Sequence, residues 1–117
     1  TISCELDSAT NPIEAIKNTF PMGSMTGAPK VKAMELAEKF ENVKRGLYAG
    51  ALGYFTPTMD FDFNVIIRSI QYNSKTGYLS LMVGSAITAN SIPEKEYDEC
   101  LVKAETLFQA LGVFINE

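Results

Sequence analysis

The sequence feature that most constrains this chain is residues 23–30, GSMTGAPK, which precede a helix-like run extending to Glu41. Two glycines, a proline and small hydroxyl residues between apolar segments predict a shaped turn that opens into a helix. Pro29 suits the first turn of that helix, where its missing N–H removes no hydrogen bond. Ser24 and Thr26 precede the exposed N–H groups, where a hydroxyl can cap the helix or an anion can bind. An ordinary helix start and an anion site are therefore both open.

Length and composition limit the class of protein. A chain of 117 residues fits one domain, and its 46% apolar and 21% charged residues are ordinary for a globular protein. The net charge of −4 argues against nucleic-acid binding. No apolar run approaches the roughly 20 residues that span a bilayer, and no signal peptide is recognised, so we expect a cytoplasmic protein without a membrane segment. The chain contains no histidine, so the commonest general base is absent. Cys4 and Cys100 are expected to be reduced and buried.

Two helices are predicted in the first half of the chain. Asn11 serves as N-cap, a proline occupies the first helical position, and Glu14 reaches back toward the cap. The second helix covers residues 31–40, and Glu35 and Lys39 on it are expected to form a surface ion pair. Its inner face is predicted to consist of Val31, Met34, Ala37 and Phe40.

The last helix is predicted to begin at the capping box SIPE, residues 91–94, and to run to about Phe114. Seven residues fill its apolar arc: Tyr97, Cys100, Leu101, Ala104, Leu107, Phe108 and Leu111. Glu96, Glu99 and Lys103 form a strip along one border of that arc. The strip is either a solvated ladder of ion pairs or a site where two carboxylates bind a hard cation such as Mg²⁺ and the lysine binds an anion.

Strands are predicted at residues 1–6, 47–55, 63–71 and 78–87, with a turn joining the last two. Gly50 and Gly53 permit close approach of another backbone segment.

Arg68 lies in the middle of the third predicted strand. Alternation places Ile66, Arg68 and Ile70 on one face of that strand, and the opposite face is apolar as well. Both apolar faces of this strand should therefore be covered by other elements. A layer of helices can cover only one of them, which leaves the second face without a partner in this chain. Arg68 is either a rim residue with a snorkelling stem or a group that binds a carboxylate through two hydrogen bonds in a partly enclosed site.

Five stretches, taken together, carry a family resemblance. They are FPMGSMTGAPK at 20–30, RGLYAG at 45–50, IIR at 66–68, VGSAI at 83–87, and SIPE at 91–94 followed by Glu96, Glu99 and Lys103. In this order they resemble the C-terminal part of the chorismate-utilising enzymes, which include the component I proteins of aminodeoxychorismate synthase and anthranilate synthase.

The resemblance implies a Mg²⁺-dependent chorismate site. Glu99 would bind Mg²⁺ directly, and Glu96 would bind it directly or through water. Five groups would face the substrate or hold its carboxylates: Ser24, Tyr48, Arg68, the backbone at Gly84, and Lys103. Chorismate is a dianion, so cationic side chains, N–H groups and a divalent cation suit it. In the family the ion polarises a carboxylate while an amine or water adds and a hydroxyl leaves.

The chain also departs from the family. Members commonly have Gly-Ala-Gly or Gly-Gly-Gly where this chain has Gly84, Ser85 and Ala86, and many have aspartate at the position of Asn90. The resemblance covers only the last quarter of enzymes that are several hundred residues long. We therefore interpret residues 1–117 as a C-terminal fragment of a catalytic domain, with the catalytic groups upstream, and expect the fragment alone to be inactive.

The family fold is a layered α/β/β/α domain, and the resemblance implies that this chain is one α+β lobe of it. The expected order is strand, two helices, three antiparallel strands and a helix. The inner face of the sheet would have no partner within this chain. Because exposing such an apolar face to water is unfavourable, we expect the fragment to form a homodimer through it.

The resemblance favours the aminodeoxychorismate branch, since serine then threonine in GSMTGAPK resembles that branch. In it, chorismate and ammonia from a glutamine amidotransferase partner give 4-amino-4-deoxychorismate for para-aminobenzoate and folate synthesis, a transaminase- or lyase-type reaction. Anthranilate synthase component I, of tryptophan synthesis, is the alternative. A small non-catalytic binding protein is the further alternative.

Overall fold

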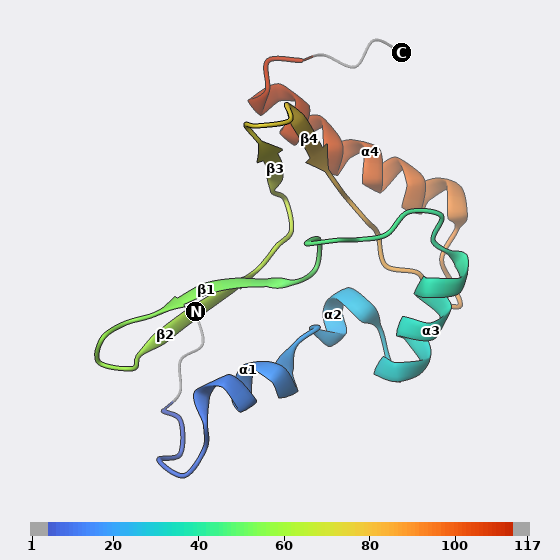
Figure 1. The fold of residues 1–117 in the computed structure, drawn as a ribbon. Helices are drawn as coiled ribbons and strands as arrows, with labels where there is room; N and C mark the ends of the chain where they lie inside the picture. The colour runs from blue at the N-terminus through green and yellow to red at the C-terminus, as the bar shows by residue number, and fades with distance from the viewer. Residues whose placement is uncertain (1–4, 114–117) are drawn as a thin grey trace. The chain divides into compact units, whose positions relative to one another are not determined.

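The computed structural model describes residues 5–113, whereas residues 1–4 and 114–117 lie outside the description. The elements follow one another in Figure 1 as α1 (Pro12–Thr19), α2 (Gly23–Thr26), α3 (Lys30–Phe40), β1 (Ala51–Phe55), β2 (Phe61–Val65), β3 (Ile70–Asn73), β4 (Tyr78–Leu81) and α4 (Pro93–Ala110). They divide into two compact units, a first unit of Thr1–Ile66 and a second unit of Ile67–Glu117. Helices together with small antiparallel sheets confirm the predicted α+β class.

The first unit contains three helices, of which α1 begins as predicted. Asn11 is its N-cap, and the Oδ1 atom of Asn11 accepts a hydrogen bond of 2.9 Å from the N–H of Ile13. The single turn of α2 was not predicted, because the sequence indicated a shaped, non-helical turn at these residues. Thr26 lies in α2 and donates its hydroxyl to the carbonyl of Met22 at 3.1 Å, so it does not cap the next helix. Pro29 is the N-cap residue of α3, so it lies immediately before the helix and not in its first turn as predicted.

The exposed surface of α3 differs from the prediction. Val31 and Phe40, expected on the inner face, are 71% and 68% exposed. The expected pair between Glu35 and Lys39 is also wrong. Glu35 pairs with Lys32 at 2.9 Å, whereas the ammonium of Lys39 lies 5.1 Å from the ring centroid of Phe40. Lysines three or four residues away on either side compete for one carboxylate, and the sequence does not settle that competition.

Strands β1 and β2 form an antiparallel hairpin in the first unit. Gly53 pairs with Phe63, and a Cβ atom at Gly53 would overlap the carbonyl of Asp62 and the ring of Phe63. This confirms the close approach predicted for that glycine. The rings of Phe55, Phe61 and Phe63 lie together, with centroid distances of 5.4 to 6.2 Å. Aromatic packing beside a glycine therefore fixes the hairpin.

The predicted strand over residues 63–71 is wrong, because the chain leaves the extended conformation between β2 and β3. Arg68 has φ of 51°, in the left-handed region that non-glycine residues rarely adopt. Strands β3 and β4 form the hairpin of the second unit, and the predicted turn between them is confirmed. The side-chain oxygen of Asn73 accepts from the N–H of Lys75 at 3.0 Å in that turn. Strand β4 ends at Leu81, earlier than predicted.

Helix α4 has Ile92 as its N-cap residue and no side-chain cap hydrogen bond, so the predicted capping box is wrong. The Ser91 hydroxyl instead accepts from the N–H of Thr88 at 3.0 Å. The helix ends at Ala110, before the predicted end. Tyr97, predicted in the apolar arc, is 65% exposed.

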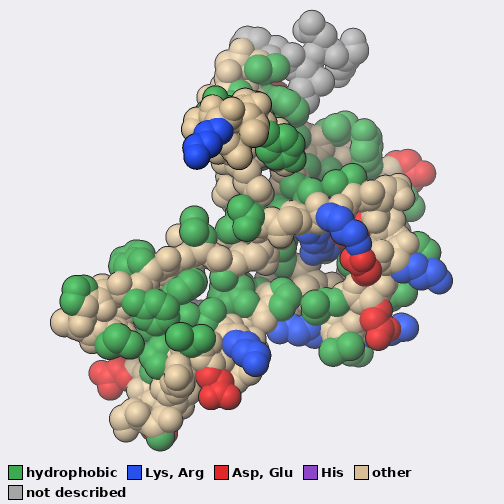
Figure 2. Space-filling model, in the orientation of Figure 1, with side chains coloured by type: hydrophobic (Ala, Val, Ile, Leu, Met, Phe, Trp, Pro, Cys, Tyr) green, Lys and Arg blue, Asp and Glu red, His purple; other side chains and the backbone are tan. Residues whose placement is uncertain are grey.

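Few side chains are fully buried in the described part of the chain. Ala49, Ala104 and Leu107 are 5%, 7% and 8% exposed. Figure 2 shows hydrophobic side chains on the visible surface, including that of the hairpin of β1 and β2. Cys100 is a free, partly buried thiol, whereas Cys4 and most of the predicted first strand lie outside the described residues. None of the helices described here is long and apolar enough to cross a membrane.

Candidate functional site

The second unit contains a group of four polar side chains and one backbone carbonyl that we call the carboxylate cluster: the side chains of Ser85, Glu96, Glu99 and Lys103, and the carbonyl of Gly84. Helix α4 supplies Glu96, Glu99 and Lys103, at spacings of three and four residues that place them along one side of a helix. Gly84 and Ser85 belong to the segment between β4 and α4. Side chains from one helix thus meet a loop from the same unit.

Hydrogen bonds hold the two sides of the carboxylate cluster together. The Ser85 hydroxyl donates to Oε2 of Glu96 and lies 3.4 Å from Oε2 of Glu99. The ammonium of Lys103 lies 2.5 Å from Oε1 of Glu99 and donates to the carbonyl oxygen of Gly84 at 2.9 Å. One hydroxyl therefore faces both carboxylates, and one ammonium connects the helix to the loop.

The charge of Glu99 is favoured by its neighbours. The hydrogen bond and the positive charge of Lys103 lower the pKa of Glu99 below its usual value, and the Ser85 hydroxyl adds a smaller effect in the same direction. The Glu99 side chain is 54% exposed and that of Lys103 31%, so solvent screens the pair. Glu99 is consequently a carboxylate that is both ionised and accessible to a ligand.

The donor chemistry of the carboxylate cluster fits a magnesium ion. Mg²⁺ prefers oxygen ligands, retains several waters and is commonly held by one or two carboxylates. Glu96 and Glu99 supply two carboxylates that approach the same hydroxyl. No group of three or more His, Cys, Asp or Glu residues that could hold a metal occurs among residues 5–113. A cation here would therefore have a site with few protein ligands.

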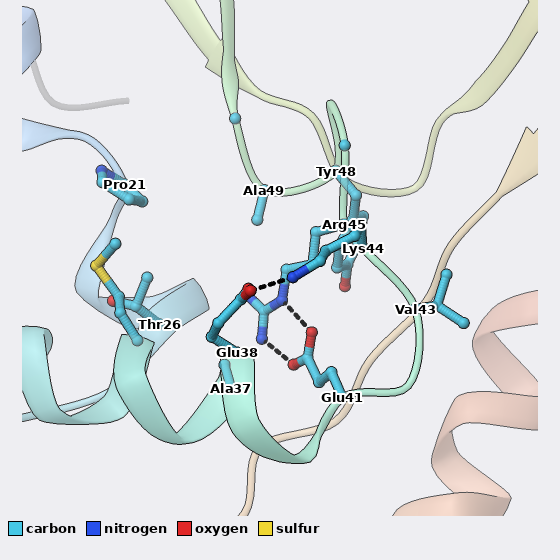
Figure 3. Close-up of a pocket in the computed structure, with 13 residues that line it drawn as sticks. Pro21, Thr26, Ala37, Glu38, Glu41, Val43, Lys44, Arg45, Tyr48 and Ala49 are labelled. Carbon is cyan, nitrogen blue, oxygen red and sulfur yellow. Dashed lines mark hydrogen bonds and ion pairs between the residues drawn. The ribbon is translucent and has the colours of Figure 1, made fainter.

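The first unit contains a pocket of about 280 Å³ (Figure 3). Its wall includes Tyr48, predicted to bind substrate, and Ala49, which is buried with φ of 65°. Arg45 binds both carboxylate oxygens of Glu41 and donates to the carbonyl of Met25 at 2.8 Å. Arg45 thereby connects α2 to the segment after α3, on the wall of the pocket.

The predicted site residues fall in different places. Gly84, Glu96, Glu99 and Lys103 come together, although Gly84 contributes its carbonyl to Lys103. Tyr48 lines the pocket of the first unit.

Ser24 is exposed on α2, outside the pocket lining, and Arg68 is exposed between β2 and β3. Two residues with central positions were missed, Ser85 and Arg45. Arg45 follows Glu41 by four residues, a spacing that could have signalled the pair, whereas nothing local to Ser85 indicated its partners.

Comparisons with known proteins agree on one family for this chain. The model of the family described as chorismate binding enzyme matches residues 1–109. The chain is 44% identical over 95 residues, 81% of its length, to the probable chloroplastic aminodeoxychorismate synthase of Oryza sativa subsp. japonica, and covers 10% of that protein. It is 40% identical over 109 residues, 93% of its length, to anthranilate synthase component 1 of Thermococcus kodakarensis, and covers 25% of it. The aminodeoxychorismate synthase of Streptomyces griseus is 39% identical over 111 residues, 95% of this chain and 15% of that protein. The chain thus spans a quarter or less of the length of these relatives.

Proposed function

The chain belongs to the family of chorismate binding enzymes, and we propose on that premise that the protein containing it converts chorismate and ammonia to 4-amino-4-deoxychorismate. Ammonia would come from glutamine through an amidotransferase partner, and the product would serve para-aminobenzoate and folate synthesis. The relatives named aminodeoxychorismate synthase, at 38% to 44% identity over most of the chain, support this branch.

One observation carries the proposal at the level of chemistry, the meeting of Glu96, Glu99 and Lys103 at one loop. Two carboxylates and an ammonium within hydrogen-bonding distance of Gly84 and Ser85 provide for a cation and an anion side by side. A carboxylate substrate bound through a divalent cation requires that combination.

Glu96 and Glu99 would hold Mg²⁺, which when bound would polarise a carboxylate of the substrate. Lys103, already beside Glu99, would provide positive charge for a substrate carboxylate, and the N–H of Gly84 would add a donor. Arg68 would bind a carboxylate through two parallel hydrogen bonds. Tyr48 and Ser24 would contribute hydroxyl groups to the substrate.

The metal assignment is tested by Glu99→Gln in the full-length protein. The variant keeps the shape of the side chain and removes its charge, so we expect Mg²⁺ binding, measured by titration calorimetry without substrate, to be lost. Glu105→Gln is the matched control, because Glu105 lies on the same helix and bonds to Gln109 outside the carboxylate cluster. Unchanged Mg²⁺ binding by Glu99→Gln would overturn the assignment.

The reaction is tested by incubating the full-length protein with chorismate, ammonia and Mg²⁺ and separating the products by chromatography. Formation of 4-amino-4-deoxychorismate, trapped as para-aminobenzoate by added lyase, is the expected result. Glutamine should replace ammonia only when an amidotransferase is added. Absence of any chorismate turnover under these conditions would reject the enzymatic proposal.

Anthranilate synthase is the second candidate, favoured by relatives of that name at 40% identity over at least 107 residues. The same incubation separates the two branches, since anthranilate is fluorescent and aromatic without a lyase. Fluorescent product would assign the protein to tryptophan synthesis and leave the roles of the site residues unchanged.

A further inference from the structure

We propose that Ser85 is a positioning residue, whose hydroxyl orients the carboxylates of Glu96 and Glu99 so that both offer an oxygen to one divalent cation. The inference rests on the proposed function, because it concerns the Mg²⁺ site assigned above. It adds a residue that touches the metal ligands and lies outside the predicted set.

The geometry gives Ser85 a separate position from the ligands it contacts. Glu96 and Glu99 belong to α4, whereas Ser85 belongs to the segment that follows β4. Its hydroxyl oxygen donates to Oε2 of Glu96 and lies 3.4 Å from Oε2 of Glu99. A contact from outside the helix can fix side-chain rotation in a way that the helix alone cannot.

Each carboxylate is thereby left with a defined orientation. Lys103 holds Oε1 of Glu99 at 2.5 Å, which turns Oε2 of the same group toward Ser85. The Ser85 hydroxyl holds Oε2 of Glu96. The two carboxylates therefore approach one another at the hydroxyl, where an ion could contact both.

Two negative groups that approach one point repel each other, and flexible glutamate side chains would otherwise rotate apart. A hydroxyl donor offsets part of that repulsion before the cation arrives. Ser85 and Glu96 are partly buried, which limits competition from water for this hydrogen bond. Partners that orient metal ligands in this way typically contribute about 10- to 100-fold to metal affinity.

Ser85→Ala in the full-length protein is the test, with Mg²⁺ alone titrated by calorimetry in the absence of substrate. We expect the dissociation constant for Mg²⁺ to rise by about 10- to 100-fold. Ser85→Thr, which retains the hydroxyl, should restore most of the affinity. Ser85→Cys, which keeps the size and offers only a weak donor, should behave like the alanine variant and provides a second reading if Ser85→Ala does not fold.

A purely structural role for Ser85 would give a different pattern. Loss of thermal stability together with unchanged Mg²⁺ affinity would overturn the proposal. In turnover assays, the positioning role predicts a higher Mg²⁺ concentration at half-maximal rate and a smaller change in the KM for chorismate. Ser74→Ala is the matched control, since Ser74 lies in the turn between β3 and β4 of the same unit.

The outcomes separate this proposal from the proposed function. If Glu99→Gln loses Mg²⁺ binding and the Ser85 variants with intact folding do not, the metal site stands and the role of Ser85 is rejected. If Glu99→Gln also binds Mg²⁺ normally, both the metal assignment and the role of Ser85 are rejected.

Discussion

Arg45 binds both oxygens of the Glu41 carboxylate, with Nε 2.8 Å from Oε2 and Nη2 2.5 Å from Oε1. Its remaining nitrogen donates to the carbonyl of Met25 at 2.8 Å. The hydrogen bond from Arg45 lowers the pKa of Glu41, and the same bond raises the pKa of Arg45. One guanidinium therefore connects α2 to the segment after α3 beside the pocket of the first unit. Figure 3 shows its two bonds to Glu41.

Arg45→Lys should destabilise the protein by about 1 kcal/mol, because lysine cannot make the two parallel hydrogen bonds and reach Met25 as well. Thermal unfolding of the full-length protein measures the change. Lys32→Gln is the comparison, since it breaks an exposed pair whose side chains are 65% and 60% exposed, and should have a smaller effect. Equal melting temperatures for Arg45→Lys and the unmodified protein would show that the pair has no structural role.

The Arg45–Glu41 pair also predicts a dependence of stability on pH. Because the folded pKa of Glu41 is lowered, its contribution is fully present above the unfolded value of about 4.3 and is lost as the pH falls through the folded pKa. Glu41→Gln should therefore lower the Tm near neutral pH and have little effect in acid. A difference in Tm between the two proteins that stays constant down to strongly acidic pH would contradict this.

Gly53→Ala should destabilise the hairpin of β1 and β2 by about 1–3 kcal/mol, as expected for overpacking. The added methyl group would meet the backbone carbonyl of Asp62, which cannot move without disturbing the strand pairing. Gly23→Ala is the control, since nothing lies within 4 Å of the position its Cβ would occupy. Chemical denaturation of both variants provides the comparison, and similar midpoints for the two would argue against the steric explanation.

Arg68→Lys should raise the KM for chorismate by about 10- to 100-fold, with a smaller change in kcat, if Arg68 binds a carboxylate through two hydrogen bonds. Steady-state kinetics of the full-length protein tests this. Lys75→Gln removes a positive charge from the exposed turn of the same unit and should leave KM unchanged. An unaltered KM for chorismate in Arg68→Lys would contradict carboxylate binding by Arg68 and favour the alternative of a rim residue.

The 117-residue chain, expressed alone, should form a homodimer through an exposed strand face. Leu52 and Tyr54 on β1 are 68% and 61% exposed, and isolated two-stranded hairpins are marginally stable in water. Light scattering at tens of micromolar should give twice the monomer mass, and Leu52→Lys should shift the balance toward monomer. A monomer at that concentration without any substitution would refute the prediction.

The predictions from sequence succeeded where the determining contacts are local. The start of α1 follows from Asn11 and the proline after it, and the turn between β3 and β4 follows from a short polar segment. Ser91 shows the limit of such reasoning, because its hydroxyl was predicted to cap α4 and instead accepts a hydrogen bond from Thr88 in the preceding loop. Arg68 shows another limit, since alternation of apolar residues continues through a position whose backbone is left-handed.

The candidate site was predictable only in part for a related reason. Glu96, Glu99 and Lys103 share one helix, so the helical period alone places them on a common side. Ser85 reaches them from a loop 11 residues before Glu96, and no periodicity relates a loop to a helix. The family resemblance supplied roles for the charged groups and none for this hydroxyl.

The pairing of Gly53 with Phe63 also affects which alternative structures the chain can reach. If β2 slipped by one residue, the Phe63 ring would face Leu52 or Tyr54, and every side chain of β2 would move to the opposite face. In the observed register, the Phe63 ring occupies space that a Cβ atom at residue 53 would fill. The missing Cβ atom at Gly53 thus favours the observed strand register, in which the Phe63 ring lies opposite the glycine.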